Sequence, residues 1–411
     1  MLRFMTAGES HGPALTAILD GFPAGLALDA AVIDRELLRR QVGFGAGPRM
    51  KLEKDHVVIL GGVMGGQTTG APLALQVAND DHAKWRGKAV EAMTAPRPGH
   101  ADLTGAVKYG LADLRPALER SSARETAARV AVGAVCKQFL AQFGIVVGGY
   151  VSAIGDVSAK VDEIAFAERL ALAEQNDVRC PDAAAAGQMR ARIEEIMHAK
   201  DTLGGVLEIV ALGVPVGLGS YAQWDRRLEA RLAAAVLSVQ AMKGVEVGPA
   251  FENAKLPGTQ VQDAIHLDTT QGSHGDTESA EKSEIKLGGS LLNRILRSSD
   301  RAGGTEGGIS NGQPIVIRVA MKPIATTLTP QATVDLAGRV EAPTKYERSD
   351  FCPVPRAVPI LESMVAFVVA DVLIEKLGGD SINEMKPRFE SLRQATLEDL
   401  QMDNIPHIFW E

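Results

Sequence analysis

Residues 120–143 read RSSARETAARVAVGAVCKQFLAQF, an alanine-rich run that predicts one continuous helix opened by arginines and serines. At about 100° per residue, Arg120 and Arg124 would lie within about 40° of each other. Ser121 would be on the adjacent surface and Arg129 on the opposite side. Guanidinium groups donate paired hydrogen bonds to oxyanions, so we expect this face to bind a phosphate or a carboxylate. A solvated face with a Glu–Arg ion pair is the alternative.

The composition is that of a globular protein. The chain has 411 residues, of which 45% are hydrophobic and 23% charged, so it is long enough for a large core or two lobes. The net charge of −8 argues against a nucleic-acid-binding protein, because phosphate backbones require a basic surface.

Cysteine use and hydropathy indicate a cytoplasmic protein outside the membrane. The three cysteines are far apart and show no spacing typical of a disulfide framework or a zinc site. The N-terminal residues MLRFMT lack the apolar region of a signal peptide. The longest apolar run, residues 364–374, is interrupted by Asp371 and falls short of the roughly 18 residues that span a bilayer.

Hydrophobic periodicity predicts an α+β fold. Helical patterns cover residues 30–41, 117–143, 185–200, 226–243 and 360–377, the last ended by Gly378. β-Branched or alternating runs predict strands over residues 57–60, 73–77, 206–211 and 314–319. Strands and helices do not alternate regularly, so we expect antiparallel hairpins rather than a doubly wound parallel sheet. The polar stretch 255–288, with His266 and His274, predicts an exposed insertion or a mobile loop, in which the histidines are surface residues or part of a lid.

Two histidines lie in glycine-bounded turns. His11 is in Gly8–Gly12, where glycines let the backbone approach a ligand and leave the imidazole accessible. His100 is in Arg97–Asp102, where Pro-Gly makes a turn and Asp102 is placed to orient or charge the ring. We predict acid–base chemistry at these histidines, with a structural role as the alternative. No HxxH or comparable spacing supports a metal site.

Further basic and glycine-rich segments favour anion binding. Arg39 and Arg40 end a predicted helix and precede the glycine-rich loop 43–47, but neither a P-loop nor a dinucleotide fingerprint is present. In the segment 301–312 and in Lys322–Thr327, we expect the backbone to pack against a flat ring. Arg348 beside Asp350 would hold that acid ionised and ready to accept a proton, with a surface ion pair as the alternative.

Together these segments resemble the chorismate synthase family. Its motifs occur here in the same order and at the same spacing, at residues 8–12, 97–102, 120–126, 301–308 and 348–350. The resemblance covers about residues 1–385, which implies a single catalytic domain there, and leaves residues 386–411 as a C-terminal tail. It also implies the family's α+β fold, a β-α-β sandwich with helices layered between antiparallel sheets, in a homotetramer.

The resemblance also implies a reaction. That family converts 5-enolpyruvylshikimate 3-phosphate to chorismate and phosphate, the last step of the shikimate pathway to aromatic amino acids. This 1,4-elimination requires reduced FMN although no net redox change occurs. Because no separate nicotinamide-binding domain is evident, we expect the monofunctional type, which depends on an external flavin reductase and uses NADPH only indirectly.

The resemblance also implies catalytic and binding roles for the residues of this chain that match the family's motifs. By resemblance, His11 protonates the departing phosphate, His100 protonates or stabilises the reduced flavin near N1, and Asp350 manages the proton at flavin N5. The positions that meet the substrate in the family are Arg40, Arg49, Arg97, Arg124 and Arg348. The flavin contacts are Arg120, Ser121, Ser122, Gln240, Ala241, Gly307, Lys322, Pro323, Ile324, Ala325, Thr326 and Arg348.

Two positions depart from the family's pattern. Ala46 stands in the glycine-rich loop where an arginine is usual, and losing a charge-assisted hydrogen bond would cost about 1.5–3 kcal/mol of substrate binding. Asp300 stands where an asparagine is common and would add negative charge near the site. We therefore expect weaker substrate binding than is usual in the family, with activity retained.

Two alternatives remain open from the sequence. The chain could itself reduce flavin with NADPH, with the lyase activity attached. It could also be a non-catalytic anion- or flavin-binding protein that has kept the scaffold, for which Ala46 and Asp300 are the only support.

Overall fold

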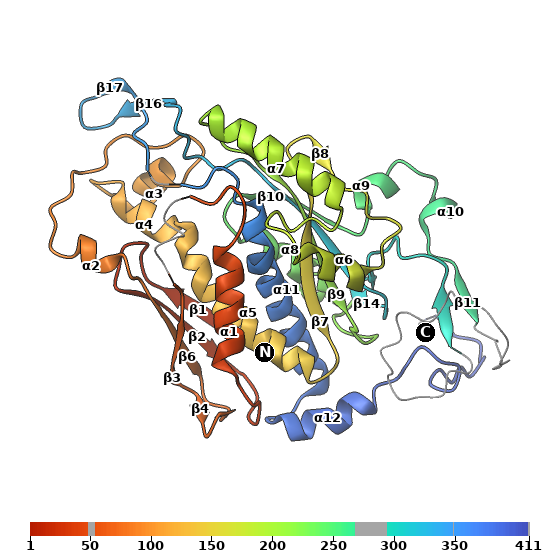
Figure 1. Cartoon of the computed structure of the whole chain (residues 1–411). Coiled ribbons are helices and arrows are strands. Elements are labelled where there is room, and N and C mark those ends of the chain that lie inside the picture. Colours follow the sequence, from red (N-terminus) through yellow and green to blue (C-terminus); the bar gives the residue numbers. More distant parts are fainter. Residues whose placement is uncertain (48–53, 268–293, 348, 410–411) are drawn as a thin grey trace.

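Alternating hydrophobic segments from the two halves of the chain build two antiparallel sheets (Figure 1). The computed structural model describes residues 1–47, 54–267, 294–347 and 349–409. The first sheet has the strand order β1 (Arg3–Ala7), β2 (Ala14–Asp20), β6 (Leu73–Ala78) and β3 (Val57–Gly61). The second has the order β10 (Met242–Val247), β15 (Ile315–Met321), β9 (Gly205–Leu212), β7 (Val146–Ile154) and β8 (Val157–Ser158).

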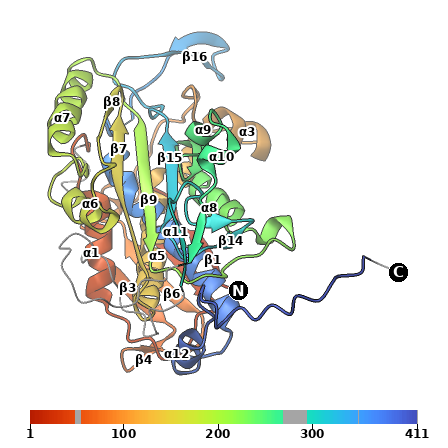
Figure 2. The same ribbon diagram turned by 90° about the vertical axis from the view of Figure 1, so that its right-hand side faces the viewer.

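A layer of helices lies between the sheets. It contains α1 (Ala30–Gln41), α5 (Thr126–Ala141), α8 (Leu228–Leu237) and α11 (Val354–Leu377). Helices α1 and α5 pack on the first sheet, whereas α8 and α11 pack on the second, whose strands β7, β9 and β15 lie side by side in Figure 2. The arrangement is an α+β fold, a β-α-β sandwich, which confirms the fold implied by the resemblance.

Helix α11 forms the centre of the core. It is apolar on all sides and buried along most of its length, because helices and strands surround it. It is long and apolar enough to cross a membrane, yet 94% of its most apolar window is buried inside the fold, so it is a core helix. Gly378 ends it with a positive φ of 61°, which confirms the predicted glycine cap.

The remaining elements cover the edges of the sandwich. Helices α6 (Phe166–Ala173) and α7 (Ala183–His198) pack against β7. The other helices are α2 (His82–Trp85), α3 (Asp102–Tyr109), α4 (Arg115–Ser121), α9 (Ala250–Asn253), α10 (Gly258–Val261) and α12 (Ile382–Glu390), with 3₁₀ turns η2 (Ala123–Glu125) and η3 (Trp224–Arg226). Short hairpins pair β4 (Val63–Met64) with β5 (Gln67–Thr68), β11 (Ile265–Leu267) with β12 (Ile295–Arg297), β13 (Thr305–Glu306) with β14 (Ile309–Ser310) and β16 (Ala332–Asp335) with β17 (Val340–Pro343).

Two predicted helices are wrong in extent. The helix expected over residues 117–143 is broken at Ser122, whose backbone is extended with ψ 141°. The Ser122 hydroxyl accepts the N–H of Arg124 and so caps a new turn, η2, before α5 begins. The helix expected over 226–243 ends at Leu237, and Ala241 has a φ of 66° that turns the chain into β10.

The sequence predicted a junction after residue 385 and an insertion or mobile loop over residues 255–288. Helix α12 crosses the expected junction between residues 385 and 386. Within the stretch 255–288, the structure describes α10 and β11, where His266 is exposed, as expected of a surface residue. His274 lies outside the described residues.

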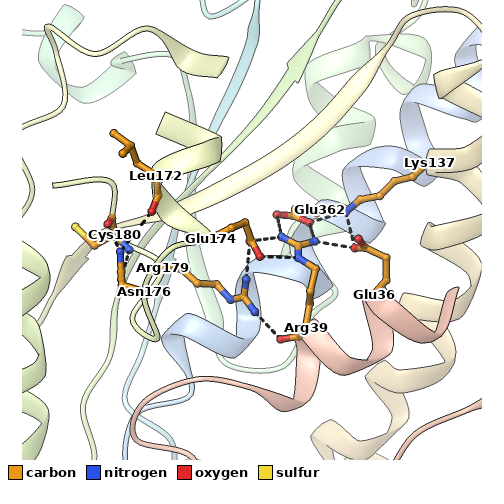
Figure 3. Close-up of polar contacts among 9 residues, drawn as sticks. All are labelled: Glu36, Arg39, Lys137, Leu172, Glu174, Asn176, Arg179, Cys180 and Glu362. Carbon is orange, nitrogen blue, oxygen red and sulfur yellow. Dashed lines mark hydrogen bonds and ion pairs between the residues drawn. The ribbon is translucent and has the colours of Figure 1, made fainter. Parts of the chain in front are cut away.

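A buried ion network joins α1, α5 and α11 (Figure 3). Glu362 is fully buried on α11 and accepts hydrogen bonds from Arg39 Nη1 at 2.6 Å and Lys137 Nζ at 2.5 Å. Arg39 also pairs with Glu174 at 2.6 Å, and Lys137 with Glu36 at 2.7 Å. Burial alone would raise the pKa of Glu362, but the two cations outweigh it and hold that pKa well below its usual range. The network therefore fixes how the three helices sit together.

Candidate active site

A cavity of about 460 Å³ lies between the start of α11, the α4–η2 junction and the segments that follow β1 and β15. Cavities of this size hold small-molecule ligands. Its lining includes these residues predicted from the sequence: His11, Arg40, Arg97, His100, Ser121, Ser122, Arg124, Gln240, Ala241, Lys322, Ile324, Ala325, Thr326 and Asp350. Another cavity, of about 450 Å³, lies beside the ion network, where its charged groups bond one another.

Other predicted residues are not in this lining. Among the described residues, Arg120, Gly307 and Pro323 lie outside it. Arg49 and Arg348 fall outside the described part of the chain. The guanidinium of Arg120 donates to the carbonyl and hydroxyl oxygens of Thr6, each at 2.9 Å. Because the backbone extends at Ser122, Arg120 and Arg124 do not share a helical face, so the predicted two-arginine face is wrong.

His11 is held by Glu119, a residue that the sequence did not indicate. One oxygen of the Glu119 carboxylate accepts the backbone N–H of His11 at 2.8 Å, and the other lies 2.7 Å from ring Nδ1. The indole of Trp85 packs on the imidazole with ring centroids 4.7 Å apart. Burial raises the pKa of Glu119, but the hydrogen bonds from His11 and the charge of Arg115 outweigh it and leave the pKa below its usual value.

His100 has the partner that the sequence suggested. Its Nδ1 lies 2.6 Å from Oδ1 of Asp102, which is fully buried in the first turn of α3. The other oxygen of Asp102 accepts Arg97 Nε at 2.8 Å. Burial raises the pKa of Asp102, but the hydrogen bonds from His100 and Arg97 bring it well below its usual range. Asp102 is therefore ionised and orients both cavity-lining side chains.

Arg40 and Arg124 meet at Asp55, which is buried and was not predicted. Arg124 Nη1 lies 2.7 Å from Asp55 Oδ1, and Arg40 Nη1 lies 3.4 Å from Oδ2. Arg124 Nε also donates to Asn79 at 2.7 Å, and Arg40 Nε donates to Thr126 at 2.9 Å. The neighbouring Arg39 instead joins the ion network, so only one of the two adjacent arginines lines the cavity.

Asp350 pairs with Arg356, which the sequence did not indicate, whereas the expected partner, Arg348, lies outside the described residues. Its Oδ1 accepts the backbone N–H of Gly47 at 2.7 Å, and its Oδ2 accepts from Nη1 of Arg356 in the first turn of α11. Arg356 Nε donates to the carbonyl oxygen of Arg40 at 2.9 Å. These contacts join the glycine-rich loop, α1 and α11 at one wall of the cavity.

Further lining residues were not assigned as contacts from the sequence, although Ser10, Gly47 and Ser349 lie in segments that it singled out. They include Ser10, Gly47, Trp85, Lys243, Glu347, Ser349 and Arg356. Lys243 was assigned to a helix although it belongs to β10, and Arg356 lies just before the segment predicted as helical. A tryptophan flanked by basic residues, Lys84-Trp85-Arg86, was the one local signal that could have drawn attention to α2.

The two departures from the family pattern lie beside the site rather than in it. The described lining contains Gly47 but not Ala46 or Asp300. Asp300 Oδ1 accepts the N–H of Gly304 at 2.9 Å, and burial raises the pKa of Asp300 to about 7. Near neutral pH, Asp300 thus brings less negative charge than an ordinary aspartate would.

The cavity combines cations with two histidines and a carboxylate. Its basic residues are Arg40, Arg97, Arg124, Lys243, Lys322 and Arg356. Such a lining suits a ligand with several anionic groups, because guanidinium and ammonium groups bind carboxylate and phosphate by charge-assisted hydrogen bonds. The histidines add groups that can transfer a proton near neutral pH.

Comparisons with known proteins agree with this chemistry. The sequence profile described as chorismate synthase matches residues 2–374. Chorismate synthase of Geobacter sulfurreducens is 47% identical over 399 residues, covering 95% of this chain and 98% of the relative. That of Pelobacter propionicus is 49% identical over 399 residues, with the same coverage. A solved structure, "Crystal Structure of Chorismate Synthase", is 42% identical, covers 95% of this chain and 96% of its own, and superposes with a TM-score of 0.72. The chain therefore belongs to the chorismate synthase family and is a lyase of that type.

Proposed function

We propose that this chain removes phosphate from 5-enolpyruvylshikimate 3-phosphate by 1,4-elimination to give chorismate, with reduced FMN and no net redox change. The observation that carries the proposal is one cavity in which two histidines, each paired with a carboxylate, meet a set of buried arginines. This combination supplies both a proton and cationic stabilisation for a phosphate leaving group.

The arginines suit the three anionic groups of this substrate, one phosphate and two carboxylates. Arg40 and Arg124 are fixed by Asp55, and Arg97 is fixed by Asp102, so their guanidinium planes are oriented before a ligand arrives. Arg49 and Arg348 remain predicted substrate contacts by resemblance to the family.

The residues around β10 and β15 fit a flavin. Gln240 Oε1 is buried and has no hydrogen-bond partner among the described residues, so it is available to a ring N–H. Lys322 Nζ lies at the rim, where it donates to the carbonyl oxygen of Gly99 at 2.9 Å. The residues that would hold FMN in the described lining are Ser121, Ser122, Gln240, Ala241, Lys322, Ile324, Ala325 and Thr326. When bound, reduced FMN supplies electron density to the substrate and recovers it.

Three side chains would handle protons, and all three line the cavity. By resemblance to the family, His11 would donate one to the departing phosphate, His100 would hold one near flavin N1, and Asp350 would act on the proton at flavin N5. Asp350 is held in position for this by the backbone N–H of Gly47 and the guanidinium of Arg356, which donate to its two oxygens.

The setting proposed for the enzyme is cytoplasmic. Cys136, Cys180 and Cys352 are free and buried, which suits a reducing compartment. By family analogy we propose a homotetramer of the monofunctional type, supplied with reduced FMN by an external flavin reductase and hence with NADPH only indirectly.

The test is anaerobic release of phosphate from 5-enolpyruvylshikimate 3-phosphate with chemically reduced FMN, oxidised FMN, or oxidised FMN plus NADPH. Release with reduced FMN alone supports the proposal. Release in the NADPH arm as well would show intrinsic flavin reductase activity and overturn the monofunctional assignment. Bound FMN with no release in any arm would contradict the proposed reaction.

A further inference from the structure

The carboxylate of Glu119 makes two contacts with a single residue. Its Oε2 accepts the backbone N–H of His11 at 2.8 Å, and its Oε1 lies 2.7 Å from Nδ1 of the same residue. The backbone carbonyl of Glu119 also accepts the N–H of Ser10 at 3.3 Å. Position and ring orientation of His11 are thus both set by the last turn of α4.

These contacts decide which ring nitrogen carries a proton. The pKa of Glu119 lies below its usual value, so at neutral pH the group is a carboxylate and can only accept hydrogen bonds. The nitrogen next to it, Nδ1, must therefore be protonated. Nε2 is left as the ring nitrogen that can exchange a proton with a ligand in the cavity.

The surroundings hold this arrangement in place. Trp85 packs on the imidazole with ring planes tilted by 55°, and Nδ1 of His82 lies 3.0 Å from the carbonyl oxygen of His11. His100 is held differently, because it shares the Asp102 carboxylate with Arg97: Oδ1 contacts His100 Nδ1 and accepts Arg97 Nη2 at 3.0 Å, and Oδ2 accepts Arg97 Nε. At the other histidine, both oxygens of Glu119 contact His11 alone, one at the backbone N–H and one at ring Nδ1.

We propose that Glu119 is a positioning residue that fixes a proton of His11 on Nδ1, so that Nε2 is the nitrogen that delivers a proton to the departing phosphate. The proposal rests on the proposed function. In the step, the C–O bond to phosphate breaks and its electron pair stays on the phosphate oxygen. That oxygen takes the Nε2 proton, and His11 becomes neutral with its proton on Nδ1.

The first variant is Glu119→Gln. An amide has one acceptor oxygen, and its NH₂ group only donates. If the oxygen stays on the backbone N–H of His11, the NH₂ group faces Nδ1 and moves the ring proton to Nε2. We expect kcat to fall on the order of 10²- to 10⁴-fold, as for an acid–base histidine in the wrong tautomer, with KM within about threefold.

Glu9→Gln is the matched control. Glu9 carries the same charge two residues from His11 in the same loop and is exposed. Its variant should keep the kcat, KM and pH profile of the wild-type enzyme. In Glu119→Gln, by contrast, kcat should fall and the pH profile should change, because the ring has lost the carboxylate beside Nδ1.

A double-mutant cycle separates action through His11 from an independent role. If Glu119 acts through His11, the double variant His11→Ala with Glu119→Gln should be no slower than His11→Ala alone. Losses that multiply would overturn the proposal. So would a Glu119→Gln enzyme with wild-type kcat and pH profile when His11→Ala is impaired.

A spectroscopic measurement on the wild-type enzyme is independent of turnover and of the folding of any variant. Selective ¹⁵N labelling of histidine, with the His11 signals assigned by their loss in His11→Ala, reports which nitrogen is protonated. A proton on Nδ1 supports the proposal, and a neutral ring protonated on Nε2 overturns it. Failure of wild-type phosphate release would instead count against the proposed function.

Discussion

Gly133 on α5 and Ser363 on α11 meet where the two helices cross, so closely that a Cβ added to Gly133 would lie 2.1 Å from the Cβ of Ser363. Gly133→Ala should therefore force the helices apart. We expect it to lower the free energy of unfolding by about 1–3 kcal/mol, although alanine is the better helix former. Denaturant unfolding measures the change.

Gly187→Ala is the control for that prediction. Gly187 lies on the exposed side of α7, and an added Cβ there would have no heavy atom within 4 Å among the described residues. Gly187→Ala should therefore raise the free energy of unfolding by about 0.5–1 kcal/mol. If both variants gained stability, the close approach of α5 and α11 would not be the reason for the glycine at 133.

Glu362→Gln should destabilise the fold and alter its acid dependence. The change removes the fully buried counter-charge that Arg39 and Lys137 share, although Glu36 and Glu174 still pair with them, and we expect a loss of about 1.5–3 kcal/mol. The folded-state pKa of Glu362 lies below its unfolded value of about 4.3, so its contribution is present above that pH and is lost as the pH falls.

Unfolding of the wild-type protein at a series of pH values tests this sign. Its stability should fall from about pH 5 downward, and Glu362→Gln should show a shallower fall. Glu384→Gln breaks an exposed pair with Arg388, 3.8 Å apart, and should change stability by less than about 0.5 kcal/mol. An equal acid slope in wild type and Glu362→Gln would show that the network does not act as described.

Asp102→Asn should impair turnover more than binding. The carboxylate accepts from both His100 and Arg97, whereas an amide would turn a donor toward one of them. We expect the kcat of Asp102→Asn to fall on the order of 10²-fold or more, and the kcat of His100→Ala to fall by a comparable factor. Steady-state kinetics measure both values of kcat. Full activity in His100→Ala would show that this histidine takes no part in the reaction.

Ala46→Arg should strengthen substrate binding. The residue next to it, Gly47, lines the cavity, so a longer cationic side chain is placed to reach an anionic ligand. One charge-assisted hydrogen bond of about 1.5–3 kcal/mol would lower KM by about tenfold or more. Ala46→Gln adds length without charge and should lower KM by a smaller factor. An unchanged KM in Ala46→Arg would contradict the expectation of weak binding.

Local patterns located the groups whose partners are close in sequence. Asp102 was expected beside His100 because only one residue lies between them, and the structure confirms that contact. Glu119 and Asp55 were missed because they reach His11 and Arg124 from distant segments, which no spacing rule reveals. Whether these residues act as the family resemblance implies stays a prediction.

For the fold as well, local patterns predicted individual elements but not the pairing of distant segments. Strands at residues 57–60 and 73–77 were expected from their apolar alternation, and both occur. Strand β7 was missed, since Gly148 and Gly149 interrupt its apolar pattern where neighbouring side chains approach closely. The strand order of each sheet depends on long-range pairing, so the sandwich came from the resemblance and not from periodicity.

The first turn of helix α11 carries Arg356 at the cavity wall, and the helix continues through the centre of the core. We therefore expect occupation of the cavity to be coupled to the unfolding of the whole core. A small molecule that binds there should raise the melting temperature of the whole protein, by an amount that grows with its concentration. At a hundred times its Kd, such a ligand adds about 2.7 kcal/mol to the free energy of unfolding, so thermal melting alone can rank candidate ligands before any turnover is measured.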